Sequence, residues 1–413
     1  MNMHFDQNKK IMLPLLAAFT FILAACNKDL PDPVPISYQP ANSSNTTLGA
    51  AISSDTTYSF FYAAVKRVNA LADLSDTNKI FTVFLPDNNA FRVSGITSLA
   101  IINALPITTV GAIVQYHIIP GQQYLSTDVP TIFPNIQLPS FLTIGALPGT
   151  SVPLKLFAFP SRRSAGFWDN NIPVVAADKK FQNGVIHVVA GIVNPPSQVL
   201  KTALNNNPNL TYFKAAIARA DSGQTGLNRF DSLLNYAVTN MTVLAPNDAA
   251  FQTLIFGLAF QSYLSTRPAP YTATDTANAF ATGNGAVAAG PAFLSTNNIS
   301  TAQVRGIMAY HFLATLNPST AHFEPNIRVF SVNFSPTPSF VTTLVNSVYS
   351  AHPGILVNAT FTGPFVTNLT FTGLGTFPPG GGPFTGAPAK AVSLDNHAVN
   401  GVYYVIDKVL LPQ

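Results

Sequence analysis

The chain has very little cysteine and little charge. One of its 413 residues, Cys26, is a cysteine, so the sequence holds no pair of thiols for an internal disulfide or for a zinc site. Charged residues make up 9% of the chain, and Glu324 is its one glutamate. The formal net charge of +4 is spread along the chain without a basic block, which leaves no electrostatic footprint for a nucleic acid.

The sequence also lacks the common catalytic patterns. No Gly-x-Ser-x-Gly elbow occurs, and the glycines at 380–382 are not followed by the Lys-Ser/Thr pair of a phosphate-binding loop. The aspartates show no pairing that favours glycoside hydrolysis, and the histidines show no His-x-His or His-x-x-x-His spacing. The sequence therefore predicts no enzyme, no cofactor and no metal ion.

The first residues of the chain have the pattern of an export signal. Lys9 and Lys10 precede an apolar run at 11–23 that is short for a membrane span, and small residues then lead to Cys26. The segment Leu-Ala-Ala-Cys resembles the bacterial lipobox. We expect a lipoprotein signal peptide over 1–25 and a diacylglyceryl group on Cys26. An ordinary signal peptide with an incidental cysteine is the alternative.

Residues 26–44 are predicted to be an extended tether, because prolines stand at 31, 33, 35 and 40. The Lys-Asp pair at 28–29 resembles the segment that directs some lipoproteins of Bacteroidetes-type bacteria to the cell surface. We therefore expect a protein of the cell envelope that contacts the membrane through its lipid anchor and is exposed on the outer membrane, with a periplasmic address as the alternative.

Four sequence landmarks occur twice, in the same order, in the rest of the chain. One of them is an apolar run ended by a proline and followed by Asn or Asp, which predicts a strand, a turn and a capped helix start. The matched segments are 58–67 with 210–219, 82–91 with 242–251, 116–119 with 310–313, and 183–189 with 400–406. This repetition predicts two copies of one domain, copy one at 45–196 and copy two at 197–413. The apolar content of 47% supplies enough material for both cores.

The landmarks resemble those of the fasciclin domain, whose pattern has a Thr-Val-Phe-Ala-Pro-like block, a central Tyr-His pair and a closing Asn-Gly-Val-Ile-His-like strand. The segment 400–412 fits the closing pattern closely, whereas copy one has Ala190-Gly191 where the family usually has an acidic residue. The resemblance implies an α+β fold of two tandem fasciclin-like domains, each with a β-sandwich-like core and short packed helices. It also implies cell-surface adhesion without catalysis.

The two Tyr-His pairs are the first candidate binding residues: Tyr116, His117, Tyr310 and His311. The resemblance assigns them a part in adhesion, since this region has been linked to adhesion in the fasciclin family. Their apolar neighbours favour a buried, hydrogen-bonded imidazole, because an unpartnered one would be costly. Burial would make their part in adhesion indirect.

The segment 162–171 is the second candidate. It holds the only tryptophan, Trp168, near Arg162 and Arg163, in what should be a hairpin between strands. Tryptophan and arginine are common anchors of interfaces, so the segment could contact a sugar or a protein. The alternative is a tryptophan that closes one end of the domain core.

Copy two is longer than copy one in two places. The first insertion, near 254–300, is rich in Ala, Thr, Asn and Gly, and the second includes 360–373 and the Pro/Gly run at 378–383. We expect loops, with an added hairpin as the alternative. Long loops on a rigid scaffold often carry binding residues, although an unselected surface excursion would look the same in sequence.

Taken together, these features predict a lipid-anchored, non-catalytic protein that binds an extracellular protein or polysaccharide. The alternative from another class is an accessory glycan-capture subunit, or an envelope enzyme, of a polysaccharide-uptake system. A gene neighbourhood with transporters and glycosidases would favour that alternative.

Overall fold

The computed structural model describes residues 44–132, 134–146, 149–295, 299–375 and 387–412. The signal peptide, Cys26, most of the tether and the run at 378–383 lie outside the described residues. Within the described ranges, no helix is both long and apolar enough to cross a bilayer. Residues 42–413 form one compact unit.

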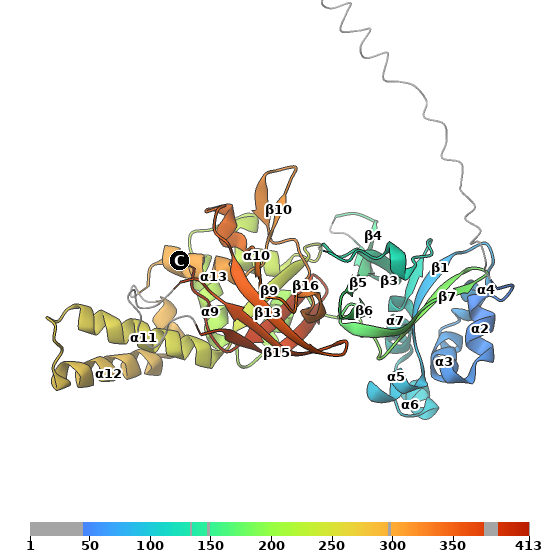
Figure 1. Cartoon of the computed structure of the whole chain (residues 1–413), viewed down its shortest axis with the longest axis horizontal. Helices are drawn as coiled ribbons and strands as arrows, with labels where there is room; N and C mark the ends of the chain where they lie inside the picture. The colour runs from blue at the N-terminus through green and yellow to red at the C-terminus, as the bar shows by residue number, and fades with distance from the viewer. Residues whose placement is uncertain (1–43, 133, 147–148, 296–298, 376–386, 413) are drawn as a thin grey trace, which may run out of the picture. The chain divides into compact units, whose positions relative to one another are not determined.

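Copy one is built on a six-stranded sheet with the strand order β2-β1-β8-β7-β6-β5 (Figure 1). Its central strands β1 and β8 run parallel, with Phe81 opposite Gly184, and both are buried over their whole length. Continuous apolar runs suit strands that are covered on both faces. The strands are β1 Phe81–Pro86, β2 Ile118–Pro120, β5 Pro160–Arg163, β6 Gly166–Asp169, β7 Ile172–Phe181 and β8 Gly184–Val189; β3 Leu138–Ala146 and β4 Pro153–Ala158 form a separate ribbon.

Short helices cover one face of this sheet. Phe61 and Val65 of α3 and Leu74 of α4 pack in one cluster with Val83 and Ile186 of the central strands. The capped helix start that the sequence predicts after β1 is confirmed. The Asp87 side chain accepts a hydrogen bond from the N–H of Ala90 and caps α5. The helices are α2 Leu48–Ser54, α3 Ser59–Arg67, α4 Leu71–Ser75, α5 Asn88–Val93, α6 Leu99–Ala104 and α7 Ile107–Tyr116, with 3-10 turns η1 Thr56–Tyr58 and η2 Ser126–Asp128.

Copy two repeats this plan. Its sheet has the order β12-β13-β14-β15-β16-β9, and the parallel pair β9 and β16 sets Met241 opposite Gly401, as Phe81 stands opposite Gly184. The strands are β9 Met241–Pro246, β12 Ser339–Val341, β13 Ile355–Thr362, β14 Phe365–Thr372, β15 Ala389–Ala398 and β16 Gly401–Ile406; β10 Thr315–Asn317 and β11 His322–Glu324 form a ribbon. The helices are α8 Leu200–Asn206, α9 Thr211–Ala220, α10 Phe230–Asn235, α11 Asp248–Ser265, α12 Ala273–Ala288 and α13 Thr301–Tyr310, with 3-10 turns η3 Gly226–Asn228, η4 Gly290–Ser295, η5 Ser331–Asn333 and η6 Leu344–Ser347.

The predicted α+β class is confirmed, since each copy combines a six-stranded sheet and a two-stranded ribbon with packed helices. The domain limits at 196 and 197 stay a prediction, because the two copies share apolar contacts. Phe159 and Trp168 of copy one belong to a buried cluster that otherwise consists of copy-two residues such as Phe330 and Tyr404.

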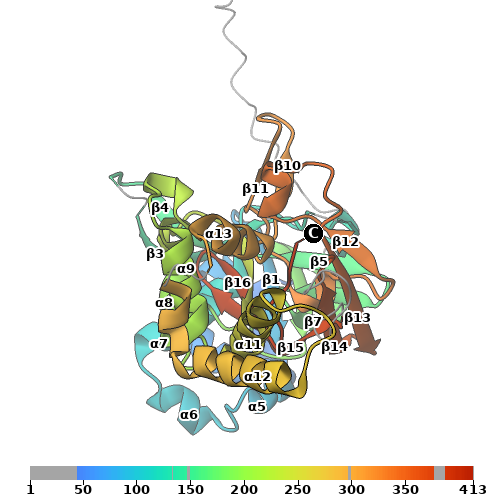
Figure 2. The same cartoon turned by 90° about the vertical axis from the view of Figure 1, so that its left-hand side faces the viewer.

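The first insertion of copy two is helical, so the prediction of loop for 254–300 is wrong. α11 and α12 lie side by side as a helical hairpin (Figures 1 and 2). A capping box between Thr272 and Asp275 starts α12. Gly283, which looks like a loop residue, permits close helix packing, because a Cβ there would lie 2.6 Å from the ring of Phe256. In the second insertion, β13 and β14 form a hairpin, but it lies beside β15 as the hairpin of β5 and β6 lies beside β7 in copy one, so it is not an addition of copy two.

Candidate functional site

His117 lies at the end of α7 and is fully buried. Its Nδ1 lies 2.7 Å from the carbonyl oxygen of Ile113, and its Nε2 lies 3.0 Å from the backbone nitrogen of Val193. A carbonyl can only accept and an N–H can only donate, so the ring is neutral with its proton on Nδ1. Burial lowers the pKa of His117 to about 4, which keeps the ring neutral at physiological pH.

His311 repeats the arrangement in copy two. It is also fully buried, its Nδ1 lies 2.8 Å from the carbonyl of Ile307, and the N–H of Leu410 donates to its Nε2 at 3.0 Å. Burial lowers its pKa to about 4 as well. Each histidine thus ties the end of a helix to the chain that follows the closing strand. The expectation of buried, hydrogen-bonded imidazoles is confirmed.

The neighbouring tyrosines are buried too. The hydroxyl of Tyr116 donates to the carbonyl of Phe157 at 2.9 Å, and that of Tyr310 donates to the carbonyl of Gly354 at 2.6 Å. Burial raises the pKa of both phenols. Neither Tyr-His pair offers a side-chain surface to a ligand, so a part in adhesion would have to act through the stability of the domain.

Trp168 lies on β6 in the predicted hairpin, which β5 and β6 form. Its side chain is completely buried, and its indole N–H donates to the carbonyl of Pro364 in copy two at 2.9 Å. A ligand ring therefore has no face of Trp168 on which to stack. The alternative interpretation, a tryptophan that closes one end of a core, fits this position, but the core that it completes is largely that of copy two.

The two arginines of the segment are half-buried. Arg163 donates to the carbonyl of Pro130 at 3.1 Å and to Oδ1 of Asn135 at 2.6 Å, and burial lowers its pKa. Asn135 in turn donates to Asn333 of copy two at 2.9 Å. Arg162 and Arg163 thus stand beside the contact between the copies, where Trp168 is fully buried.

Sequence reasoning missed a buried polar group beside Trp168. Asp169 is fully buried, its carboxylate has no well-formed hydrogen bond beyond a weak contact with the backbone N–H of Asn170, and burial raises its pKa to about 7. Across the contact, the buried guanidinium of Arg328 lies over the ring of Phe159 at 4.5 Å and 2.8 Å from Nε2 of His397. No spacing in the sequence brings these residues together.

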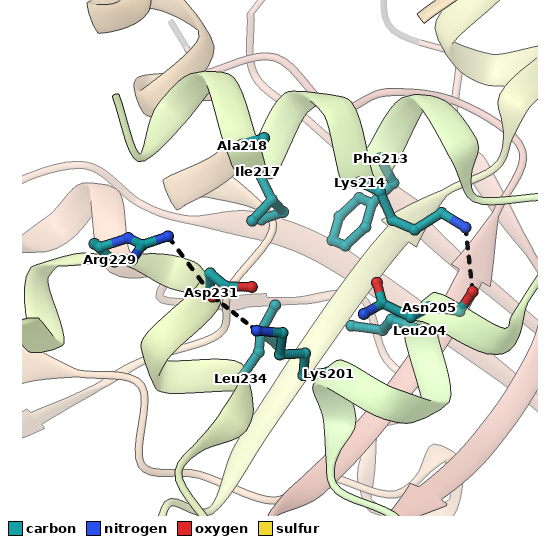
Figure 3. A pocket seen from close by; sticks show the side chains of 10 residues that line it. All are labelled: Lys201, Leu204, Asn205, Phe213, Lys214, Ile217, Ala218, Arg229, Asp231 and Leu234. Carbon is teal, nitrogen blue, oxygen red and sulfur yellow. Dashed lines mark hydrogen bonds and ion pairs between the residues drawn. The ribbon is translucent and has the colours of Figure 1, made fainter. Parts of the chain in front are cut away.

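A surface pocket of about 160 Å³ lies among α8, α9 and α10 of copy two (Figure 3). Leu204, Phe213 and Ile217 are among the apolar residues of its floor. Figure 3 shows Asp231 joined to both Lys201 and Arg229, with Lys214 directed toward the backbone of Asn205; Asp231 Oδ2 lies 2.9 Å from Lys201 Nζ and 3.7 Å from Arg229 Nη2. The pocket is a candidate binding site that none of the sequence landmarks indicated. No group of three or more His, Cys, Asp or Glu residues that could hold a metal ion occurs in the part of the chain that the structure describes.

Copy one is similar to a known domain family. Residues 56–195 match the model of the fasciclin domain. A fasciclin-like arabinogalactan protein of Arthroderma benhamiae is 28% identical over 156 residues, which are 38% of this chain and 32% of that protein, so the match spans about a third of that relative. A solved domain pair from the insect cell adhesion molecule Fasciclin I is 14% identical, with 86% of this chain and 96% of that chain covered at a TM-score of 0.29.

Proposed function

We propose that this chain, whose residues 56–195 are a fasciclin domain, is a non-catalytic binding protein that a lipid on Cys26 holds at the cell surface. Fasciclin domains are linked to cell adhesion. The ligand that we propose is an extracellular protein or polysaccharide, and the address is the outer face of the outer membrane.

The observation that carries the proposal is that four histidines are buried, where their side chains contribute to the stability of the protein. His117, His187, His311 and His352 are all at most 3% exposed. A general base must reach the proton that it removes, and a buried imidazole cannot do so; those of His117, His187 and His311 are in addition bonded on both nitrogens. The residue types best suited to acid-base chemistry at neutral pH therefore serve stability here, which favours binding over turnover.

The lipid anchor is supported by the sequence of the leader alone. A lone cysteine directly after Leu-Ala-Ala, with a Pro-rich segment behind it, suits a lipidated N-terminus and a tether that holds the binding domains away from the bilayer. One acyl chain binds a membrane weakly, whereas the several chains of a diacylglyceryl-modified cysteine give stable anchoring.

An array of glycans and extracellular matrix proteins tests the proposal. The probe is a labelled fragment of residues 42–413, the compact unit, with the same fragment after heat unfolding as control. We expect the folded fragment to bind a restricted set of ligands and to release no product from them. Cleavage of a bound polysaccharide, or an array without any ligand for the folded fragment, would contradict the proposal.

A further inference from the structure

The pocket of Figure 3 occurs on a helical scaffold that both copies share. In copy one, Oδ1 of Asn183 accepts the N–H of Leu48, and its amide donates to the carbonyl of Leu74. In copy two, Asn400 makes the same bonds to Leu200 and Leu234. These paired contacts fix α2 and α4 as the counterparts of α8 and α10.

The same contacts fix which residues correspond. Gly49, which follows Leu48, is the counterpart of Lys201, which follows Leu200. α3 and α9 are aligned by the N–H groups of Phe60 and Tyr212, which donate to Asn88 and Asp248 at the start of the next helix after the central strand. Tyr62 is therefore the counterpart of Lys214.

Leu74 and Leu234 are also counterparts, because the two asparagines bond to them. The residues that precede them therefore correspond as well: Asn69 to Arg229, and Leu71 to Asp231. All four charged residues on the rim of the pocket thus replace uncharged residues of copy one. Copy one carries a charge at a different lining position, since Lys66 corresponds to Ala218, so the two copies place their charges differently on this scaffold.

The replacement of Gly49 also limits how closely the two helices can pack. In copy one, a Cβ on Gly49 would lie 2.2 Å from Oγ of Ser75 and 3.1 Å from its backbone nitrogen, so α2 and α4 meet at a distance that only glycine allows. Lys201 carries a Cβ and a long side chain, so α8 cannot approach α10 in this way. The side chain of Lys201 instead reaches Asp231.

The charges of the rim are unequally satisfied. Asp231 forms an ion pair with Lys201 and lies near Arg229. Arg229 also lies 3.8 Å from the buried Asp221. Lys214 bonds only to a neutral group, the backbone carbonyl of Asn205 at 3.2 Å, and has no carboxylate partner among the described residues. A ligand carboxylate at Lys214 would supply the negative charge that this lysine lacks as a partner. Asp231 is placed to accept hydrogen bonds from hydroxyl groups of the same ligand.

We propose that the pocket among α8, α9 and α10 binds a uronic acid residue of an acidic polysaccharide, an inference that rests on the proposed binding function. A uronate combines the three features that the pocket complements. Its carboxylate meets Lys214, its hydroxyls meet Asp231 and the amide of Asn205, and the apolar C–H face of its ring covers the floor.

Calorimetric titration of the full chain, purified in detergent, tests the proposal. The probes are oligogalacturonate, oligoglucuronate and neutral oligogalactose of equal length. We expect binding of an acidic oligomer and none of the neutral one. Lys214→Gln should weaken acidic binding by roughly tenfold or more, since a charge-assisted bond is lost, while Lys214→Arg should retain most of it.

Lys66→Gln is the matched control, because Lys66 is an exposed lysine of α3, the counterpart of α9, and lies away from the pocket. It should bind as the wild type does. Failure of the wild type to bind either acidic oligomer, equal binding of the neutral oligomer, or equal affinity in Lys214→Gln and the wild type would overturn the inference. If the array of extracellular ligands still shows binding in any of these cases, the proposed function stands without the uronate site.

Discussion

The side-chain oxygen of Asn400 lies 2.7 Å from the backbone nitrogen of Leu200, two hundred residues earlier in the chain, and Asn183 holds Leu48 in the same way at 2.8 Å. Each asparagine is buried at the turn into the last strand of its copy, and its amide also donates to two carbonyls at the end of a helix. One side chain thus joins the closing strand to two helices.

Asn183→Ala and Asn400→Ala should each destabilise the protein by on the order of 1 to 3 kcal/mol, because each removal leaves buried backbone groups without partners. Thermal unfolding followed by circular dichroism measures the effect. Asn278→Ala, on the exposed face of α12, is the control and should change the midpoint little. Equal midpoints for Asn400→Ala and the control would refute the role given to these asparagines.

Acid should destabilise the protein through its buried histidines. The pKa of His311 is lowered from 6.5 to about 4 in the folded state, so the unfolded chain binds the extra proton first. The stability that the neutral ring confers is complete above pH 6.5 and is lost as the pH falls toward 4. The free-energy difference between wild type and His311→Gln should shrink over this range by on the order of 3 kcal/mol. Denaturant unfolding at pH 7, 6, 5 and 4 measures it, and a constant difference would contradict the assignment.

Asp169 should destabilise the protein as the pH rises, whereas the histidines destabilise it as the pH falls. Its folded pKa of about 7 lies above the ordinary value of 3.8, so folding favours the protonated carboxyl, and stability falls as the pH rises from about 4 to about 7. Asp169→Asn keeps the shape and removes the charge. It should match the wild type near pH 4 and exceed its stability at pH 8 by up to about 4 kcal/mol. A variant that is less stable than the wild type at both pH values would show that the carboxylate has partners when ionised.

The anchor is tested at Cys26. Cys26→Ala should abolish labelling of the protein by a fatty-acid probe and release it from membranes, because the thiol is the one that the chain can offer for lipidation. The melting curve of residues 42–413 serves as reference, since the lipid would lie outside the compact unit. Membrane retention and labelling equal to those of the wild type would exclude lipidation at this cysteine.

Local sequence patterns predicted those parts of the fold that depend on local physics. The strands β1 and β8 and the helix cap at Asp87 depend on residues that are neighbours in the sequence, so a short window of sequence is enough to predict them. For Trp168 the sequence leaves a surface contact and a core position both open, because its partner, the carbonyl of Pro364, lies nearly two hundred residues away. Composition suggested loop for α12, since the packing of Phe256 on Gly283 leaves no mark in a single helix.

The pocket and the Asp169 cluster could not be predicted for the same reason. Lys201, Lys214 and Asp231 come from three helices and have no characteristic spacing. Their correspondence with Gly49, Tyr62 and Leu71 becomes visible only when the hydrogen bonds of the two asparagines align the copies.

The central claim is that the buried histidines stabilise the two cores and do not contact the ligand. Its most direct test compares the ligand binding and the stability of His117→Ala and His311→Ala with those of the wild type. Both variants should unfold at lower temperature, with a loss on the order of 1 to 3 kcal/mol. On the first ligand that the array identifies, we predict wild-type affinity for each variant at temperatures where it is fully folded, because the rings lie inside the cores. A histidine variant with the wild-type melting curve and no adhesion would contradict the account, since the Tyr-His pair would then contact the ligand itself.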